Sequence, residues 1–236
     1  MDDLLKGLLG ALRLLVSADP QVWGIIGTSL RVSLTALGLG ALLGIPAGAW
    51  LGLRVKRPRW ALALLYTAMG VPPVVLGLLV YVFISRSGIL GSLGLPFIPR
   101  LFTVEAMIVA QALRALPLVT TLTMSAVMGV DAGLKQQVLA LGATRLQLAA
   151  VVLREARTGV VVALVGGFAA LISEVGAVML VGGNVAGQTR VLTTAIVLET
   201  GQGNFDRALA LGFVLLTLAF VGNLLLTRLQ AVSAHG

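Results

Sequence analysis

Two charged residues, Arg114 and Glu174, stand inside long apolar stretches of the chain. A charge in such a place is costly, so it is usually paired or lines a path for a polar solute. We expect the two side chains to approach each other, with Ser173 as the polar neighbour of Glu174. Two interpretations of the pair stay open: a structural ion pair, or an arginine that steers an anion when the carboxylate moves away.

A glycine-rich stretch after the segment of Glu174 carries four further polar residues: Asn184, Gln188, Thr189 and Arg190. The apolar run that follows, residues 191–198, is too short to cross a bilayer, and we expect it to form a re-entrant or gate helix. Donors at the N-terminal end of such a helix, together with the positive charge, suit a tetrahedral dianion. A glycine-rich surface turn with one solvated arginine is the competing interpretation.

Residues 131–157 form a long polar stretch between apolar segments. Asp131 is placed to cap a first helix, which Gly142 ends because glycine tolerates the left-handed conformation. The capping box of Thr144 and Gln147 starts a second helix. The first helix is expected to expose the polar residues Lys135, Gln136 and Gln137. Its apolar residues Leu134, Val138 and Leu141 are expected to lie along its other side. We expect a bent helical platform that docks another protein; a solvated connector is the alternative.

The residue types that most enzyme sites need are scarce in this chain. It has no cysteine and a single histidine, His235, close to the C-terminal end of the sequence. Hydrolase motifs such as His-Glu-x-x-His and Gly-x-Ser-x-Gly do not occur. The nucleotide-binding pattern Gly-x-x-x-x-Gly-Lys-Ser/Thr is also missing, since none of Lys6, Lys56 and Lys135 precedes Ser or Thr. We therefore expect no catalytic residue, no metal site and no cofactor in this chain.

Composition places these residues in an integral membrane protein. Of 236 residues, 58% are hydrophobic and 11% are charged, and the mean hydropathy is +1.03. A soluble domain of this size could not hide that much apolar surface. The net charge of +8 is typical of a membrane chain whose lysines and arginines set its orientation, so the lipid bilayer and not nucleic acid is the expected partner.

Five apolar segments are long enough to span a bilayer, and they must do so as helices. They comprise residues 32–53, 60–84, 106–130, 158–183 and 208–227. We expect kinks at the prolines inside the first three, Pro46, Pro72-Pro73 and Pro117, which either accommodate rocking of the spans or serve static packing. The predicted fold is therefore all-α, a single transmembrane domain over residues 1–236.

The ends and loops of the chain add an orientation. Residues 1–20 repeat leucine at helical spacing, and we expect an interfacial helix there; an additional oblique span that merges with the first one is the alternative. The loops after the first and third spans are rich in positive charge: Arg54, Lys56, Arg57 and Arg59, then Lys135, Arg145, Arg154 and Arg157. Such loops face the cytoplasm, which puts the N-terminus outside and the C-terminus inside.

Part of the polar stretch resembles the cytoplasmic signature loop of the permease subunits of bacterial ABC importers. It reads Gln136-Gln137-Val138-Leu139-Ala140-Leu141-Gly142-Ala143, followed by Thr144 and Arg145. The Gly-Ala step of that loop is present, whereas its Glu-Ala-Ala start and its closing proline are not. The likeness continues at residues 171–177, 181–184, 187–190 and 199–200. Over nearly its whole length the chain is similar to the tungstate-type oxyanion importer permeases, which are close to the molybdate ones.

The resemblance implies a homodimer of five-helix subunits of the methionine- and molybdate-importer type in the bacterial inner membrane. Two copies of a separate ATPase, which hold ATP and Mg, would drive it, and an extracytoplasmic substrate-binding protein would supply it. The bent loop would be the coupling helix, with contacts from Asp131, Lys135, Gln136, Gln137, Gly142, Ala143, Thr144 and Arg145.

The implied activity is import of an oxyanion by alternating access, tungstate before molybdate. A permease for another small solute and a carrier that needs no ATPase stay open.

Overall fold

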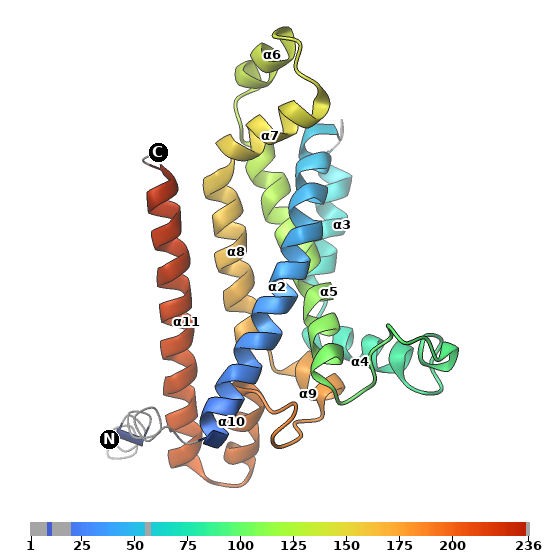
Figure 1. Cartoon of the computed structure of the whole chain (residues 1–236), viewed down its shortest axis with the longest axis vertical. Helices are drawn as coiled ribbons and strands as arrows, with labels where there is room; N and C mark the ends of the chain where they lie inside the picture. Colours follow the sequence, from blue (N-terminus) through green and yellow to red (C-terminus); the bar gives the residue numbers. More distant parts are fainter. Residues whose placement is uncertain (1–8, 11–19, 55–57, 235–236) are drawn as a thin grey trace. The chain divides into compact units, whose positions relative to one another are not determined.

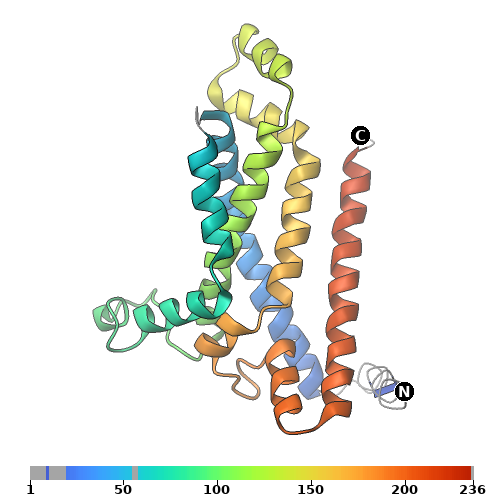
Figure 2. The same cartoon turned by 180° about the vertical axis from the view of Figure 1, so that it is seen from behind.

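The structure is a computed structural model of the chain, and it describes residues 9–10, 20–54 and 58–234. These residues form helices and connecting turns, with no β-strand among them (Figures 1 and 2). In chain order the elements are α2 (Pro20–Arg54), α3 (Pro58–Gly70), α4 (Pro73–Ile84), the 3₁₀ turn η1 (Gly91–Leu93), α5 (Val104–Met128), α6 (Ala132–Ala140), α7 (Arg145–Glu155), α8 (Arg157–Ile172), α9 (Gly176–Gly182), α10 (Leu192–Gly201) and α11 (Phe205–Ala234). The predicted all-α fold is confirmed. The interfacial helix predicted at residues 1–20 lies outside the described residues, apart from residues 9–10 and 20.

Three helices of the described chain are long and apolar enough to cross a membrane by themselves: α2, α5 and α11. Two pairs reach that length together, α3 with α4 and α8 with α9. If each bent pair is one span, these elements correspond to the five predicted spans.

The helix that contains the first predicted span begins at Pro20, well before residue 32, where the predicted span begins. The added turns contain polar residues whose hydroxyls bond back to the carbonyls of their own helix. Thr28 Oγ1 donates to Gly24 O at 2.9 Å, and Ser29 Oγ donates to Ile25 O at 2.7 Å. Because such bonds satisfy a hydroxyl inside a helix, a low local hydropathy did not mark the helix end.

The first of the two bent pairs breaks where the local sequence disfavours a continuous helix. The chain turns by 84° between α3 and α4, where Pro72 precedes Pro73. Proline lacks the N–H donor and disfavours the helical conformation of the residue before it. The break of 56° between α8 and α9 contains Glu174. At Pro46 and Pro117 the helices run on without interruption.

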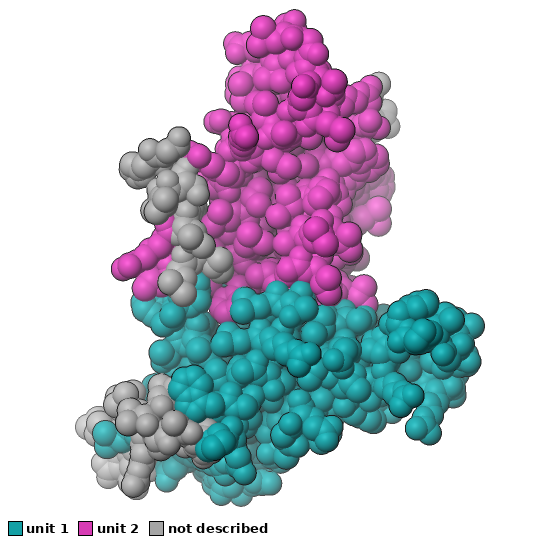
Figure 3. Space-filling model, viewed as in Figure 1, with its two compact units in different colours: residues 1–36, 72–111, 169–222 teal, residues 37–71, 112–168, 223–236 magenta. Residues whose placement is uncertain are grey.

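By its internal contacts the chain divides into two compact units (Figure 3). Unit 1 comprises residues 1–36, 72–111 and 169–222, and unit 2 comprises residues 37–71, 112–168 and 223–236. Four helices contribute residues to both units: α2, α5, α8 and α11.

In unit 2 a stripe of glycines lets α2 approach α5 closely. The glycines recur every four residues, about one helical turn: Gly40, Gly44, Gly48 and Gly52. A Cβ added at Gly48 would lie 2.6 Å from the carbonyl oxygen of Thr120, and one at Gly40 would lie 2.5 Å from Cβ of Ala115. Close backbone approach of this kind favours association of apolar helices in lipid, where burial of apolar surface gives no driving force.

In unit 1 the corresponding close contact joins α4 and α9. A Cβ added at Gly77 would lie 2.6 Å from Cα of Ala177, and one at Gly176 would lie 2.4 Å from Cγ2 of Val74. Buried apolar side chains of four helices pack around this contact, among them Val32, Val80, Ile84, Met107, Val178 and Val181. This packing fixes α9 and the polar loop that follows it.

Candidate functional site

The first polar region, here called the platform, comprises residues 131–157 and contains α6 and α7. Both helices lie at one end of unit 2, beyond the last turn of α5 (Figures 1 and 2). Asp131 caps α6 as predicted, because its carboxylate accepts the N–H of Leu134 at 2.9 Å. The last turn of α5 leaves carbonyls without helical donors, and one of them, Val127 O, accepts a hydrogen bond from Lys135 Nζ at 2.9 Å.

The bend of the platform also agrees with the prediction. Gly142 has a φ of +82°, in the left-handed region, and its N–H donates to Leu139 O at 3.0 Å. Thr144 and Gln147 form the predicted capping box: Thr144 Oγ1 accepts the N–H of Gln147 at 3.3 Å, and Gln147 Oε1 accepts the N–H of Thr144 at 2.7 Å. Local caps therefore fix both helix starts and the turn between them.

The side chains of the platform differ in part from the expected pattern. Gln136 and Gln137 are exposed as predicted, whereas Lys135 is half-buried by its bond to α5. Leu141, predicted to lie along the inner side, is 88% exposed, because it follows the last turn of α6 as its C-cap. With Leu146, which is 84% exposed, it gives the platform apolar side chains beside polar ones such as Arg145. Exposed leucines rimmed by polar residues are typical of a docking surface for another protein.

Glu174 lies at the break between α8 and α9 and is 5% exposed. Its Oε1 accepts the N–H of Ala177 in the first turn of α9 at 3.2 Å. Its carbonyl oxygen accepts the hydroxyl of Thr193 at 2.7 Å. The neighbouring Ser173 is exposed, and its hydroxyl donates to Ala169 O at 2.8 Å. The break therefore gives the buried carboxylate a donor from the backbone of the next helix.

Arg114 is half-buried in α5 and belongs to unit 2, whereas Glu174 belongs to unit 1. The approach of these two side chains stays a prediction.

The second polar region, here called the glycine loop, comprises residues 182–190 in unit 1. Two consecutive residues with positive φ open it, since Gly183 and Asn184 have φ values of +68° and +51°. Thr189, which is 1% exposed, closes the loop: its hydroxyl donates to Gly182 O at 2.5 Å and accepts the N–H of Val185 at 2.9 Å. Thr189 thus holds the loop and does not present its hydroxyl to solvent.

The backbone donors expected for an anion are used inside the loop. The N–H groups of Gln188, Thr189 and Arg190 all donate to Val185 O, at 3.0 to 3.2 Å. The first N–H group of α10 is also engaged, since Leu192 N donates to Ser29 Oγ at 2.9 Å. These four backbone donors are therefore not available to an anion at this loop. Helix α10, Leu192–Gly201, confirms the predicted short apolar helix, and its role as a gate stays a prediction.

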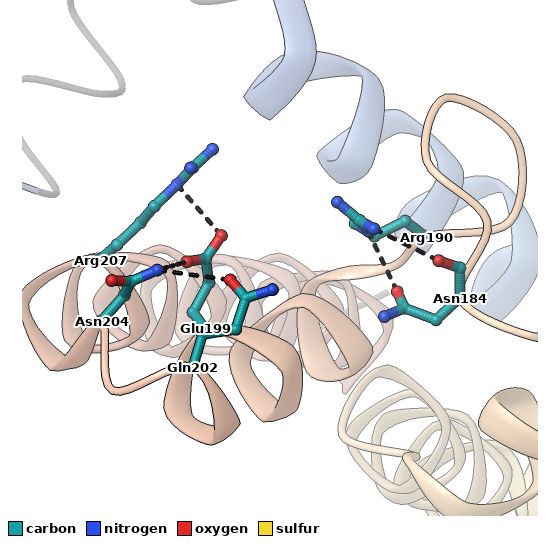
Figure 4. A network of polar contacts seen from close by, with 6 residues as sticks. All are labelled: Asn184, Arg190, Glu199, Gln202, Asn204 and Arg207. Atoms are coloured by element: carbon teal, nitrogen blue, oxygen red, sulfur yellow. Dashed lines mark hydrogen bonds and ion pairs between the residues drawn. The ribbon is translucent and has the colours of Figure 1, made fainter.

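A cleft of about 610 Å³ lies beside the glycine loop within unit 1. Its polar lining includes Gln21, Thr28, Gln188, Arg190, Glu199 and Arg207. Arg190 is held by Asn184, whose side-chain oxygen accepts from Nε at 3.2 Å and whose carbonyl accepts from Nη2 at 3.4 Å (Figure 4). Both bonds leave further guanidinium N–H groups of Arg190 for a guest in the cleft.

A second cluster lines the same cleft around the carboxylate of Glu199 (Figure 4). Glu199 is 6% exposed, accepts from Asn204 Nδ2 at 3.0 Å and lies 3.4 Å from Nε of Arg207. The sequence analysis did not identify Glu199 or Arg207 as site residues. The available signal was an acid at the end of an apolar run, eight residues before an arginine. With two guanidinium groups and one carboxylate, the cleft carries an excess of positive charge.

Among the residues that the structure describes, no three His, Cys, Asp or Glu side chains come together in a group that could hold a metal ion.

Comparison of the chain with known proteins identifies its family. Residues 40–235 match the family model described as "Binding-protein-dependent transport system inner membrane component". The tungstate uptake system permease protein TupB of Peptoclostridium acidaminophilum is 40% identical over 98% of this chain and 99% of its own. The molybdenum transport system permease protein ModB of Escherichia coli K12 is 30% identical over 93% of this chain and 97% of its own.

Solved structures agree at the level of fold. An inward-facing form of the MetNI methionine ABC transporter superposes with a TM-score of 0.70 at 19% identity, over 91% of this chain and 94% of the other. With the family model covering most of its length, the chain belongs to the binding-protein-dependent transport system inner membrane components and is a transporter permease, not an enzyme.

Proposed function

We propose that this chain is the membrane-spanning subunit of an ATP-driven importer for a tetrahedral oxyanion, tungstate first and molybdate second. The observation that carries the proposal is the 40% identity to a tungstate permease over 98% of the chain. The cleft supports it independently, because Arg190 and Arg207 offer fixed guanidinium donors of the kind that bind oxyanions.

The platform is proposed to couple the permease to a separate ATPase that carries ATP and Mg. The chain has no Walker A sequence of its own, so the energy of ATP must enter through contact with another protein. Exposed Leu141 and Leu146, with Gln136 and Arg145 between or beside them, form the surface that a groove on the ATPase would cover. The capped helices and the bend at Gly142 keep this surface in one conformation.

The assembly is proposed to be a homodimer with two ATPase subunits and an extracytoplasmic substrate-binding protein. A twofold interface gives a path for the anion that five helices of one subunit would barely enclose. The positive charge of the loops supports an orientation with the platform and the C-terminus in the cytoplasm and the N-terminus outside the inner membrane. The glycine loop and the cleft would then face the binding protein.

Transport is proposed to follow alternating access. ATP binding closes the ATPase pair, draws the two platforms together and moves the spans between inward-facing and outward-facing arrangements. Such a change requires that nucleotide or substrate bind the two arrangements with different affinity. Arg190 would attract the anion, and Arg114 with Glu174 would lie on or beside its path.

The direct test is uptake of tungstate by proteoliposomes that contain the permease, its ATPase and the binding protein. Uptake should require ATP and all three proteins, and molybdate should compete less well than tungstate. ATP-dependent uptake of a different solute class, with no response to either oxyanion, would contradict the proposed substrate. Uptake without ATP or the ATPase would instead favour a carrier that works alone.

The contribution of the cleft is tested with Arg190→Gln. Loss of one charge-assisted pair should lower uptake at limiting tungstate by roughly tenfold. Arg190→Lys is the matched control, because it keeps the positive charge but lacks the planar guanidinium group that donates two hydrogen bonds to Asn184. If both variants transport like the unchanged protein, Arg190 does not bind the anion.

A further inference from the structure

A small polar cavity lies within unit 1 at the break between α8 and α9, apart from the lining of the cleft. Its volume is about 10 Å³, and five polar side chains line it: Ser29, Ser33, Gln111, Glu174 and Thr193. All five residues are buried, with exposed fractions of 3–5%. A concentration of polar groups this far from solvent must be satisfied internally.

Gln111 is the lining residue whose side chain lacks one of its hydrogen bonds. Its Nε2 donates to the carbonyl oxygen of Leu171, in the last turn of α8, at 3.0 Å. This bond fixes which end of the amide is nitrogen and which is oxygen, because a carbonyl can only accept. The opposite atom, Gln111 Oε1, is buried and has no hydrogen-bond partner. It lies on a residue that lines the cavity.

Two of the three hydroxyl protons in the lining are already used. Ser29 Oγ donates to Ile25 O at 2.7 Å, and Thr193 Oγ1 donates to the carbonyl of Glu174 at 2.7 Å. Carboxylate and amide oxygens are acceptors, so Glu174 in its ionised form adds a second acceptor to the lining. No group of the lining, the hydroxyl of Ser33 included, donates to Gln111 Oε1, so the cavity presents an acceptor that a guest with a donor would satisfy.

We propose that this cavity binds one water molecule, which donates a hydrogen bond to Gln111 Oε1. The volume decides the class of guest, since a site needs about 10–15 Å³ by this measure to hold one water. A tetrahedral oxyanion is far too large for it, so this site is distinct from the cleft. A water also suits the polar lining, because buried waters typically make two to four hydrogen bonds to groups that the protein leaves unsatisfied.

The water makes the break between α8 and α9 a hydrated hinge. Leu171 O accepts from both Gln111 Nε2 and the N–H of Glu174, so Gln111 binds the end of α8 while its other atom holds the water. Water exchanges hydrogen-bond partners at little cost when the distance between them changes. Gln111 is thus a positioning residue: it ties α5 to the broken span through one fixed bond and one exchangeable bond.

Hydroxyl-radical labelling by X-ray radiolysis of the full-length protein in lipid nanodiscs tests this site. A bound water generates radicals next to it, so Leu171, Ile172 and Val191 should be modified although they are at most 5% exposed. Gln111→Met keeps the length of the side chain and removes the acceptor, and it should reduce this labelling by at least about threefold. Absence of labelling in the unchanged protein, or equal labelling in the variant, would overturn the proposal.

Thr123→Val is the matched control. Thr123 is also buried on α5, and its Oγ1 also has no hydrogen-bond partner, but it does not line this cavity. The Thr123→Val variant should leave labelling at Leu171, Ile172 and Val191 unchanged. If it loses as much labelling as Gln111→Met, the loss is a general effect of core substitution, and the proposed site is refuted.

A second measurement on the unchanged protein distinguishes water from a cation. The melting temperature should be the same in sodium chloride and in choline chloride, because a water guest needs neither ion. A saturable rise of the melting temperature with sodium concentration would show that the oxygens of the cavity hold a cation. The proposal of a bound water would then be wrong. Neither measurement depends on tungstate transport, so the site and the proposed function can fail separately.

Discussion

The platform at residues 131–157 and the glycine loop at residues 182–190 are both polar, yet different bonds hold them. In the platform, the capping side chains bond to residues three apart, as Asp131 does with Leu134. In the glycine loop, Thr189 binds Gly182, and the adjoining Leu192 binds Ser29 of α2. A cap forms within one segment, whereas the longer bonds require that distant segments have already met.

Exposure differs in the opposite sense. The platform leaves apolar side chains in the open, with Leu141 88% and Leu146 84% exposed. The region of the glycine loop buries polar ones, with Thr189 1% and Glu199 6% exposed. An exposed apolar surface is stabilised by covering it with another protein, and buried polar groups are stabilised by one another. The exposure of the platform fits the contact proposed for it, and the burial in the region of the glycine loop fits polar groups held in fixed positions.

The largest expected effect concerns Glu174, the buried carboxylate nearest the glycine loop in the chain. We predict that Glu174→Arg alone lowers the free energy of unfolding by about 3–5 kcal/mol, because it leaves buried charge without compensation. The double variant Arg114→Glu with Glu174→Arg should recover most of the loss if the two side chains pair. Unfolding by SDS titration in mixed micelles measures both. A double variant no more stable than the single one would show that Arg114 and Glu174 do not pair.

An exposed ion pair of the same unit serves as the control. Arg31 and Glu105 approach to 3.9 Å, with side chains 66% and 62% exposed. Surface pairs of this kind contribute about 0–1 kcal/mol, so Glu105→Arg should change the stability little.

The next effect falls on the platform and leaves the fold intact. Leu141→Asp should cost at least about 2 kcal/mol of affinity for the ATPase, roughly thirtyfold, since it puts a charge at the centre of a covered apolar contact. Leu141→Met keeps the apolar volume and should bind normally. Co-purification of the ATPase and ATP-driven uptake measure the effect. Normal association of the Leu141→Asp protein would exclude this face of the platform as the contact.

The bonds of the platform explain why so much of it was predictable. The cap at Asp131, the left-handed Gly142 and the box of Thr144 and Gln147 each depend on residues within one turn of each other. The apolar spans were predictable for the same reason, since length and composition decide them. The exposure of Leu141 was not, because it depends on where the last turn of α6 ends.

The interior of unit 1 was predictable only in outline. The sequence indicates polar residues near Arg190, but the use of Thr189 to close the loop depends on the carbonyl of Gly182, seven residues away. The pairing of Glu199 with Arg207 and the bond of Gln111 to Leu171 join separate helices. The early start of α2 was missed because polar Thr28 and Ser29 lower the hydropathy while bonding to their own helix. Contacts between separate segments decide the loop closure and the two pairings, whereas the start of α2 depends on local hydrogen bonds that hydropathy does not count.

A pair of threonine variants measures the difference between the two regions directly. Thr189→Val leaves the carbonyl of buried Gly182 and the N–H of Val185 without their hydroxyl partner, which should cost about 2 kcal/mol of unfolding free energy. Thr144→Ala removes an exposed N-cap and should cost about 1 kcal/mol. The same SDS titration compares them. Equal losses would mean that the long bonds of the glycine loop stabilise no more than a local cap.

The smallest effect is expected at Gly142, where no atom lies within 4 Å of an added Cβ and only the φ of +82° opposes a side chain. Gly142→Ala should cost about 1 kcal/mol, because an L-residue disfavours the left-handed region. Gly38→Ala is the control, since Gly38 lies in α2 with open space around its Cβ position and should lose nothing. If the bend transmits force from the ATPase, Gly142→Ala should raise the ATP hydrolysed per oxyanion imported while Gly38→Ala leaves that ratio unchanged. An unchanged ratio in both variants would restrict the bend to a structural role and leave the leucines of the platform as the coupling element.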